Sequence, residues 1–221
     1  MLLAISEMFE GDTSEATIPA CAVELVHCYS LVHDDLPCLD NDEFRRAKPT
    51  CHKKFGEAIA LLTGDALLTL AFQTLSKMRD AAKTQRILEE LAQAAGTFGM
   101  VGGQVVDIMS NRSEIDLPTL DYLSIHKTGQ LVRASCVVGA IVAGADSERE
   151  FRVMKFGEYL GFAFQVVDDI LDGNGYLGFI SAKEARAKAA ELVEKAKKEI
   201  ASFVRNERLL QIADFILERR K

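Results

Sequence analysis

The sequence predicts an all-α protein, a single bundle of long helices around a central cavity. Only 4 of its 221 residues are proline, and the good helix formers Ala, Leu, Glu and Lys are abundant. Alternating polar and apolar runs, which are typical of strands, are missing. The chain also shows no fixed-period repeat and no low-complexity linker, so we expect one domain over residues 1–221.

Apolar periodicity and breaker residues place the individual helices. Pro19 suits the first turn of a helix, which we expect to run from 20 to 36 and to stop at Pro37. The segment 182–206 has the clearest pattern, because its apolar residues recur every three or four positions while Lys and Glu fill the other faces. The remaining helices are predicted at 56–79, 84–107, 117–142, 148–172 and 208–221.

Composition and charge exclude several functional classes. The net charge of −7 is unfavourable for binding nucleic acid, which relies on basic patches. Five cysteines without a C-x-x-C pair favour a reduced, cytoplasmic protein. No secretory signal is visible at residues 1–9, and the longest apolar stretch, 137–145, is about half of a membrane span. We therefore expect no membrane span.

Two acidic clusters each follow an apolar helix. The first is H-D-D-L-P-C-L-D-N-D-E at 33–43, and the second is F-Q-V-V-D-D-I-L-D at 164–172. Carboxylates at a helix C-terminus are disfavoured by the helix dipole and repel one another, so a cation should offset them. Mg²⁺ needs only one or two protein carboxylates and completes its shell with water and substrate phosphates. The clusters therefore indicate magnesium and a phosphorylated substrate.

Spacing brings the carboxylates of each cluster together. Asp168 and Asp172 lie one helical turn apart on one face, with Asp169 beside them and Gln165 on the same stripe. In the first cluster, Asp34 and Asp35 end a helix, the chain bends at Pro37, and Asp40 can fold back toward them.

Cationic side chains accompany the first cluster. Arg45 and Arg46 follow it, and arginine forks suit bidentate phosphate binding. His27 lies two helical turns before Asp34 on the same stripe and can point into the same cavity. His33 and His52 lack such support, and we interpret them as structural.

Two further segments complete the motif survey. The segment H-K-T-G at 126–129 supplies another cation, Lys127, and a hydroxyl, Thr128. The stretch G-G-Q-V-V-D at 102–107 has no phosphate-loop spacing, so its glycines are expected to allow close helix packing.

These motifs resemble those of the trans-prenyl (polyprenyl) diphosphate synthases. The stretch D-D-L-P-C-L-D-N-D, followed by F-R-R-A-K-P-T, is similar to the first aspartate-rich motif of that family, and F-Q-V-V-D-D-I-L-D is similar to the second. H-K-T-G and G-G-Q-V-V-D match further family segments in the expected order. The resemblance covers essentially the whole chain.

The resemblance implies an isoprenoid synthase fold, a homodimer and short-chain prenyl transfer. Isopentenyl diphosphate would condense with dimethylallyl or geranyl diphosphate, and no nucleic acid or membrane partner is expected. Three Mg²⁺ ions would be held by the two aspartate clusters. The implied ligands and contacts are these: metal, Asp34, Asp35, Asp40, Asp168, Asp169 and Asp172; allylic diphosphate, Arg45, Lys127 and Gln165; isopentenyl diphosphate, Arg46 and His27; forming carbocation, Thr128.

Product length depends on the residues a turn or more before Asp34, which project down the pocket. Tyr29, with Ser30 beside it, is bulky, and similar enzymes with an aromatic residue here make the fifteen-carbon farnesyl product. We therefore expect farnesyl diphosphate. Because the segment 36–42 also resembles plastid geranylgeranyl synthases, geranylgeranyl diphosphate is the alternative.

The chain departs from the family pattern in two places. The family carries a G-G-K-R segment upstream, and the sequence begins just after its place. The family also has a lysine-bearing loop after the second motif, and here residues 173–178 replace it. We expect both pieces to exist in the full protein, and an intact mass near 24.3 kDa would refute this.

Three other classes remain as alternatives. An HD-type phosphohydrolase would use His27, His33, Asp34 and Asp168 but leaves the other aspartates and Arg45-Arg46 unexplained. A terpene cyclase would need an N-D-x-x-S-x-x-x-E pattern, which does not follow Asp172. A non-catalytic subunit of a partner synthase would be expected to lose one aspartate cluster, and both are intact here.

Overall fold

The computed structural model describes residues 1–110 and 115–219 and confirms the all-α prediction. Helices account for 78% of the described residues. The described residues form a single sheet, which has two strands of two residues each. All five cysteines are free thiols, as predicted from their number and spacing.

The described chain forms two compact units. One unit comprises Met1–Ala16 and Gln85–Lys221, and the other comprises Thr17–Thr84. The boundaries fall inside helix α2 (Thr13–Asp34) and helix α5 (Ala81–Ala95). The single domain predicted over residues 1–221 stays a prediction.

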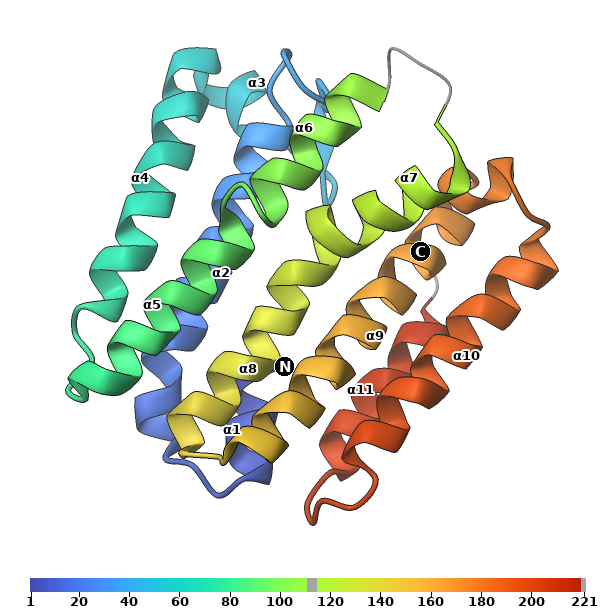
Figure 1. The fold of residues 1–221 in the computed structure, drawn as a ribbon. Helices are drawn as coiled ribbons and strands as arrows, with labels where there is room; N and C mark the ends of the chain where they lie inside the picture. The colour runs from blue at the N-terminus through green and yellow to red at the C-terminus, as the bar shows by residue number, and fades with distance from the viewer. Residues whose placement is uncertain (111–114, 220–221) are drawn as a thin grey trace. The chain divides into compact units, whose positions relative to one another are not determined.

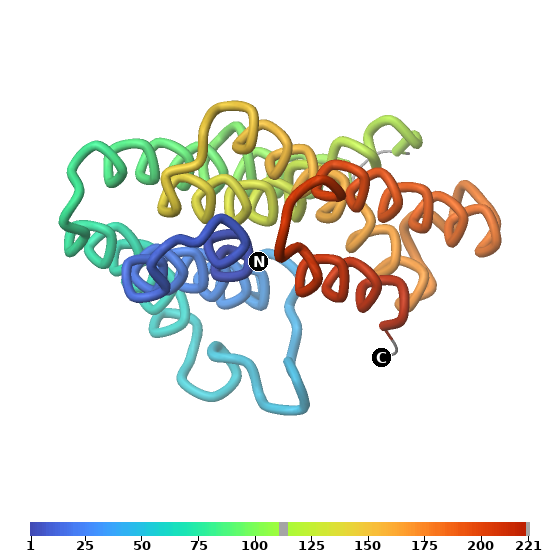
Figure 2. Tube along the Cα trace, turned by 90° about the horizontal axis from the view of Figure 1, so that it is seen from below, coloured from blue at the N-terminus to red at the C-terminus, as the bar shows by residue number. Residues whose placement is uncertain are grey.

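In the larger unit, α9 (Ser147–Asp172) is the central helix. It packs against α8 (Gln130–Ala143) and α10 (Ala182–Ile200), and α11 (Glu207–Glu218) contacts both α9 and α10 (Figure 1). Figure 2 shows α10 and α11 side by side in a second view. The core is dry, since Phe156, Leu160 and Val166 of α9 have no exposed surface.

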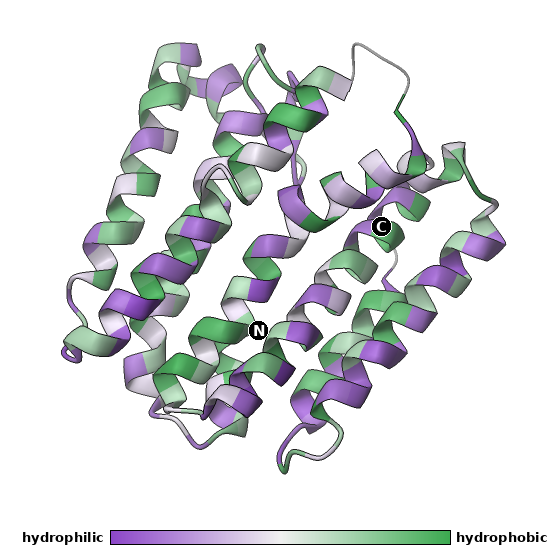
Figure 3. Ribbon diagram, in the orientation of Figure 1, coloured by the Kyte–Doolittle hydropathy of each residue, from purple (hydrophilic) through white to green (hydrophobic). Residues whose placement is uncertain are grey.

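Helix α10 confirms the clearest periodic pattern in the sequence, but it ends at Ile200 rather than at residue 206, so the predicted apolar position Phe203 lies beyond it. Its predicted apolar positions are buried against the core cluster, whereas its Lys and Glu residues form the hydrophilic stripe visible in Figure 3. The buried positions are Ala185, Ala189, Leu192, Ala196 and Ile200. The helix begins at a capping box, in which Ser181 and Glu184 bond each other's backbone N–H groups.

Two predicted helices of this unit are interrupted. The helix expected over 84–107 is wrong as one element: α5 ends at Ala95, and α6 runs over Met100–Ser110. A Cβ atom at Gly99 would lie 1.9 Å from the carbonyl oxygen of Ala94, so only glycine fits this break. The helix expected over 117–142 is continuous but contains a π-helical turn, η1 (Ser124–Gly129), between α7 (Leu117–Leu123) and α8.

The ends of the chain also differ from the prediction. A short helix, α1 (Leu2–Met8), packs on α8 and was not predicted. The last helix, expected over 208–221, ends at Glu218, and residues 220–221 lie outside the described part of the chain.

Helix α2, most of which belongs to the smaller unit, begins earlier than predicted. Asp12 accepts a hydrogen bond from the Ser14 N–H at 2.8 Å and caps the helix, so Pro19 lies inside α2 rather than in its first turn. After α2 come the strands β1 (Phe44–Arg45) and β2 (Lys48–Pro49), which were not predicted, the short helix α3 (Cys51–Phe55), and α4 (Glu57–Leu75). The helix expected over 56–79 therefore ends four residues early.

The strands β1 and β2 form a hairpin with a two-residue turn. Phe44 pairs with Pro49 and Arg45 with Lys48, and the turn residues Arg46 and Ala47 have φ angles of 51° and 61°. Positive φ at both central residues defines a type I′ turn, in which glycine is preferred. The hairpin thus holds two non-glycine residues in a strained conformation.

We expect the Ala47→Gly substitution to stabilise the protein. A non-glycine residue in the left-handed region is costly, so the free energy of unfolding should rise by about 0.5–1 kcal/mol. Ala66→Gly, at an exposed position inside α4, is the matched control and should lower it by about 1 kcal/mol. Urea unfolding measures both, and equal losses from the two substitutions would contradict the strain argument.

Helix α4 is the one helix among the described residues that is long and apolar enough to cross a membrane by length and composition. The apolar stretch of this helix has a mean hydropathy of 1.5, and 22% of it is buried. Length and composition alone do not establish a membrane span, because core helices of soluble proteins share them.

Candidate functional site

The first aspartate cluster begins where α2 ends. The helix stops at Asp34, ahead of Pro37, which cannot continue it. The backbone then turns back, and the Asp40 N–H donates to the Asp34 carbonyl at 2.9 Å. The structure thus confirms that Asp40 folds back toward the end of the helix, as the spacing predicted.

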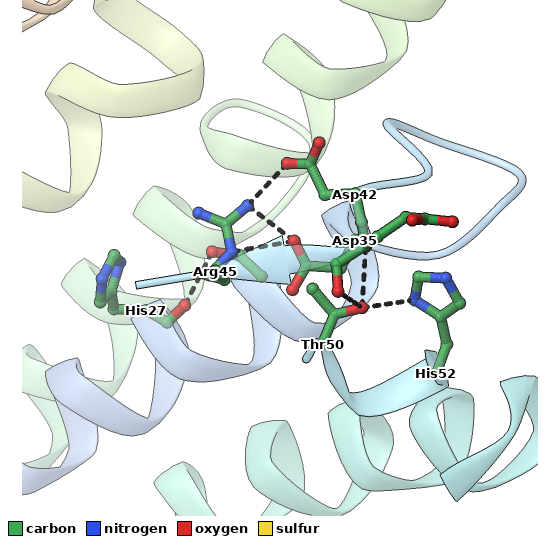
Figure 4. A network of polar contacts seen from close by, with 8 residues as sticks. His27, Asp35, Asp42, Arg45, Thr50 and His52 are labelled. Carbon is green, nitrogen blue, oxygen red and sulfur yellow. Dashed lines mark hydrogen bonds and ion pairs between the residues drawn. The ribbon is translucent and has the colours of Figure 1, made fainter. Parts of the chain in front are cut away.

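Arg45 is held against this cluster by two carboxylates. Its Nε donates to Asp35 Oδ1 at 2.8 Å, its Nη2 lies 2.7 Å from the same oxygen, and Nη2 reaches Asp42 at 3.4 Å (Figure 4). Asp35 is only 4% exposed, and its hydrogen bond is the main cause that raises the pKa of Arg45. Asp35, a predicted metal ligand, is therefore paired with Arg45, a residue predicted to bind the allylic diphosphate.

His27 lies near the two arginines, as expected from its place on α2. Burial is the main cause that lowers the pKa of His27, Glu24 opposes this, and the positive charges of Arg46 and Arg45 lower it further. The Ser30 hydroxyl donates to the His27 carbonyl at 2.9 Å. The imidazole of His27 is therefore influenced both by the negative charge of Glu24 and by the positive charges of Arg46 and Arg45.

The lowered pKa of His27 predicts a pH dependence of stability. The unfolded chain takes up a proton near the ordinary value of 6.5, whereas the folded chain does so at lower pH. The free energy of unfolding should therefore fall as the pH drops below about 6.5. His27→Gln should remove part of this slope in urea unfolding between pH 7.5 and pH 5, and an unchanged slope would contradict the assignment.

The remaining predicted residues of α2 pack inside the smaller unit. Tyr29 is 6% exposed and contacts the His33 ring edge to face at 5.9 Å. His33 Nε2 lies 3.0 Å from the Leu61 carbonyl of α4, and a Cβ atom at Gly64 would fall 1.9 Å from that nitrogen. His33 thus joins the end of α2 to α4, which agrees with its interpretation as structural.

In the larger unit, the second aspartate cluster belongs to a chain of hydrogen bonds. The Thr128 hydroxyl donates to Gln165 Oε1 at 2.8 Å, and Gln165 Nε2 donates to Asp169 Oδ1 at 2.8 Å. The other oxygen of Asp169 accepts the Tyr176 N–H at 3.1 Å. Gln165 therefore pairs with Asp169 and not, as its spacing suggested, with the Asp168 stripe.

Asp169 is buried, unlike the two aspartates beside it. Its residue is 6% exposed, and burial is the main cause that raises its pKa despite the bonds from Gln165 and Tyr176. Asp172 is exposed at the last turn of α9, and the Asp168 side chain is 36% exposed. Asp168 and Asp172 are consequently the accessible carboxylates of this cluster.

Asp168 has a cationic partner that the sequence analysis missed. Arg219 Nη2 lies 3.1 Å from Asp168 Oδ1, and its guanidinium sits 4.3 Å from the centre of the Phe164 ring. Arg219 also lines a cavity of about 910 Å³ between α9, α10 and α11, with apolar walls that include Ile170 and Leu171. The only sequence signal was the basic run 219–221, which was assigned to the predicted helix over 208–221 and given no role in the site.

Lys127 is positioned by α6. Its Nζ lies 2.7 Å from Asp107 Oδ2, which belongs to the G-G-Q-V-V-D stretch. A Cβ atom at Gly103 would lie 2.5 Å from the Lys127 backbone nitrogen, so the glycine lets α6 touch the π-helical turn. The prediction that these glycines serve close helix packing is confirmed for Gly103, whereas a Cβ atom at Gly102 would meet the Thr97 carbonyl of the preceding turn.

The short segment after the second cluster has a structural role that sequence reasoning did not find. Tyr176, in the 3₁₀ turn η2 (Gly175–Gly178), is fully buried, and its hydroxyl bonds Asp121 and lies 3.4 Å from Ser124. Lys188 Nζ also reaches Asp121 at 2.8 Å. This network closes the segment 173–178 onto the core.

The carboxylates fit a magnesium site of a particular kind. No group of three or more His, Cys, Asp or Glu residues that could hold a metal exists among residues 1–110 and 115–219. Asp168 and Asp172 provide oxygen donors alone, and Mg²⁺ requires no more than one or two protein carboxylates when phosphates and water supply the rest. The donor chemistry therefore fits Mg²⁺ bound together with a phosphorylated ligand.

The sequence and structure are similar to those of known prenyl synthases. The chain is 39% identical to "Farnesyl diphosphate synthase" of Escherichia coli, an alignment that covers 100% of the chain and 83% of the relative. It is 48% identical to "Geranylgeranyl pyrophosphate synthase, chloroplastic" of Catharanthus roseus over 78% of the chain and 49% of the relative. The structure of an FPP/GFPP synthase from Zymomonas mobilis superposes with a TM-score of 0.94 at 38% identity, covering 98% of this chain and 81% of that one.

The extent of these matches bears on the two departures noted in the sequence. The chain spans about half the length of the chloroplastic relatives that it matches. The alignment to the E. coli relative runs over 249 residues although this chain has 221, so that relative has residues without a counterpart here. The family model for "Polyprenyl synthetase" matches residues 1–177, which include both aspartate clusters, and the chain belongs to this family.

Proposed function

We propose that the protein is a short-chain trans-prenyl diphosphate synthase that condenses isopentenyl diphosphate with an allylic diphosphate to give farnesyl diphosphate. The observation that carries the proposal is that a chain of this family has two aspartate clusters and cationic side chains held in place by carboxylates. Each cluster lies in a unit that also holds a lysine or arginine fixed by a carboxylate: Arg45 by Asp35, and Lys127 by Asp107. Such prepositioned cations suit a diphosphate leaving group.

The two cations would act on the departing diphosphate. As the bond between the allylic carbon and oxygen breaks, negative charge grows on the diphosphate, and Lys127 and Arg45 are the proposed groups that take it up. Because both side chains are already held by carboxylates, little reorganisation is needed at that moment. The Thr128 hydroxyl donates its hydrogen bond to Gln165. The lone pairs of the Thr128 oxygen would therefore be available to face the allylic cation.

The rest of the reaction follows from the substrates. The double bond of isopentenyl diphosphate, held by His27 and Arg46 in this proposal, attacks the cation. A proton then leaves, and the departed diphosphate is its proposed acceptor. Apolar side chains around the tail would keep water from the cation.

Magnesium is the proposed cofactor, with three ions bound together with substrate. Asp168 and Asp172, with Asp34, Asp35 and Asp40 of the first cluster, are the proposed ligands. Asp169 is buried and bonded to Gln165 and Tyr176, which makes it the weakest of the predicted ligands. When bound, the ions would neutralise the charge of the diphosphate. Arg219 would have to leave Asp168, and the cavity beside it provides the room.

The test is incubation of the purified protein with isopentenyl diphosphate, Mg²⁺ and each allylic diphosphate in turn. Chromatographic sizing of the products should show chains five carbons longer than the primer and an end product of fifteen carbons. Omission of Mg²⁺ should abolish them. Release of phosphate without prenyl transfer, or no reaction with any primer, would contradict the proposal.

Geranylgeranyl diphosphate is the second candidate product, because the chain is 48% identical to a chloroplastic geranylgeranyl synthase. We expect Tyr29→Ala to lengthen the product beyond fifteen carbons, since Tyr29 is a bulky buried residue of α2 five positions before Asp34. Leu3→Ala, an exposed position on α1, should leave the length unchanged. An unchanged product from Tyr29→Ala would place the chain-length stop elsewhere.

We also propose that the protein forms a homodimer, and α4 supports this. Three large apolar residues on one face of this helix are at least 40% exposed: Ile59, Leu62 and Leu70. A second copy of the chain would cover such a face. Light scattering of the purified protein should give twice the chain mass.

A cytoplasmic location agrees with the reduced cysteines, although several relatives are named as chloroplastic.

A further inference from the structure

One buried histidine of the smaller unit is connected to the diphosphate-binding arginine through a series of hydrogen bonds. His52 of α3 is 7% exposed, and its Nδ1 lies 3.1 Å from the Thr50 hydroxyl. Thr50 is 3% exposed, and the same hydroxyl lies 2.7 Å from the Asp42 carbonyl oxygen (Figure 4). The sequence had suggested only a structural role for His52.

The direction of these hydrogen bonds follows from the donors available. A threonine hydroxyl can donate only one hydrogen bond. The Thr50 hydroxyl donates it to the carbonyl of Asp42, because a carbonyl can only accept. The hydroxyl must then accept from His52, so the imidazole carries its proton on Nδ1. His52 Nε2 is buried and has no hydrogen-bond partner among the residues that the structure describes. The ring is therefore fixed through Nδ1 alone.

The bonds continue from Asp42 to the site. Thr50 also binds Glu43, the residue after Asp42, since the Thr50 N–H donates to the Glu43 carbonyl at 3.0 Å. These contacts fix the segment from which the Asp42 carboxylate reaches Arg45 Nη2 at 3.4 Å. Arg45, in turn, is held on Asp35. A displacement of the Asp42 backbone would remove one of the two carboxylates between which the guanidinium is held.

We propose that His52 is a positioning residue of the allylic diphosphate site. Its Nδ1–H fixes the Thr50 hydroxyl, which holds Asp42 and thereby sets the orientation of Arg45. The inference rests on the proposed function, because it assigns Arg45 to the allylic diphosphate. His52 does not itself touch the substrate in this proposal.

Two pairs of variants test the proposal. Thr50→Val removes the hydroxyl at nearly constant shape, and Thr50→Ser keeps it. His52→Leu removes the donor, and His52→Asn keeps an N–H at the position of Nδ1. We expect Thr50→Val and His52→Leu to raise the KM for the allylic diphosphate about tenfold at equal concentrations of folded enzyme, whereas Ser and Asn should restore it to within about threefold.

The double variant distinguishes this arrangement from two independent effects. Since His52 acts through Thr50, the combination of Thr50→Val with His52→Leu should raise KM no further than Thr50→Val alone. Thr63→Val, which removes a hydroxyl bonded to the Ile59 carbonyl in α4, is the matched control and should not change KM. A merely structural role would lower the yield of folded enzyme, and hence the maximal rate, without changing KM.

The outcomes separate this inference from the proposed function. If the wild-type protein neither turns over nor binds an allylic diphosphate, the proposed function is wrong. If the wild-type protein is active but Thr50→Val and Thr50→Ser share its KM, the positioning role is wrong. Should His52→Leu fail to fold, the comparison of the two Thr50 variants still decides.

Discussion

Replacement of Asp168 by asparagine is expected to reduce kcat for prenyl transfer by about a thousandfold. Asp168 is the half-exposed carboxylate of the second cluster, and the substitution removes one negative charge while it keeps the size of the side chain. Loss of a metal ligand forfeits several kcal/mol of charge stabilisation in the transition state, and each ~1.4 kcal/mol is tenfold in rate. Steady-state kinetics at saturating substrates and Mg²⁺ measures the effect.

A matched control shows whether the effect is local. Glu191→Gln makes the same chemical change on α10, where Glu191 is exposed and pairs only with Lys195 among the ion pairs of the described residues. It should leave kcat within about twofold. Because the Asp168–Arg219 pair is partly exposed, its loss should cost less than about 1 kcal/mol of stability. A kcat within tenfold of the wild type for Asp168→Asn would contradict its assignment as a metal ligand.

The Gly103→Ala substitution is expected to have the largest effect on stability. The new Cβ would lie 2.5 Å from the Lys127 nitrogen and 2.8 Å from its Cα, and these backbone atoms cannot rotate away. Helix α6 would have to move off the π-helical turn, so the free energy of unfolding should fall by about 1–3 kcal/mol. Because the same movement displaces Lys127 from Asp107, the KM for the allylic diphosphate should rise as well.

Gly178→Ala is the comparison for this prediction. A Cβ at Gly178 meets no atom of residues 1–110 or 115–219 within 4 Å, and its φ is not positive, so the free energy of unfolding should change by less than about 0.5 kcal/mol. Urea unfolding of both variants measures the difference. Equal stability of Gly103→Ala and Gly178→Ala would show that α6 and the π-helical turn are not in the close contact described above.

Local sequence patterns were sufficient for the long helices and insufficient for their interruptions. The stripe of α10 depends on its own residues, so the periodicity placed Ala185–Ile200 correctly. The start of α2 depended on the Asp12 cap rather than on Pro19. The break between α5 and α6 depended on the approach of the Gly99 backbone to Ala94; the glycines at 96 and 99 mark it in the sequence, but the prediction of one helix over 84–107 did not use them.

The sequence also identified most of the site residues, but not their partners. The motifs placed Asp34, Asp168 and Arg45, and the spacing predicted that Asp40 folds back. It did not predict that Gln165 pairs with Asp169, because a residue three or four positions before an aspartate can face either neighbour on the helix. Arg219 was missed, because its partner lies 51 residues away.

The sequence by itself determined which chemical groups are present: two carboxylate clusters at helix ends, with lysine and arginine residues close behind the first. This information is local, since it depends on residue type and on separations of a few residues. Only the tertiary structure decided which carboxylate binds which cation and which aspartate is buried. Asp35 with Arg45, Asp107 with Lys127 and Asp168 with Arg219 are separated by 10, 20 and 51 positions. Such pairs form only when packed helices and the hairpin bring distant residues within hydrogen-bonding distance.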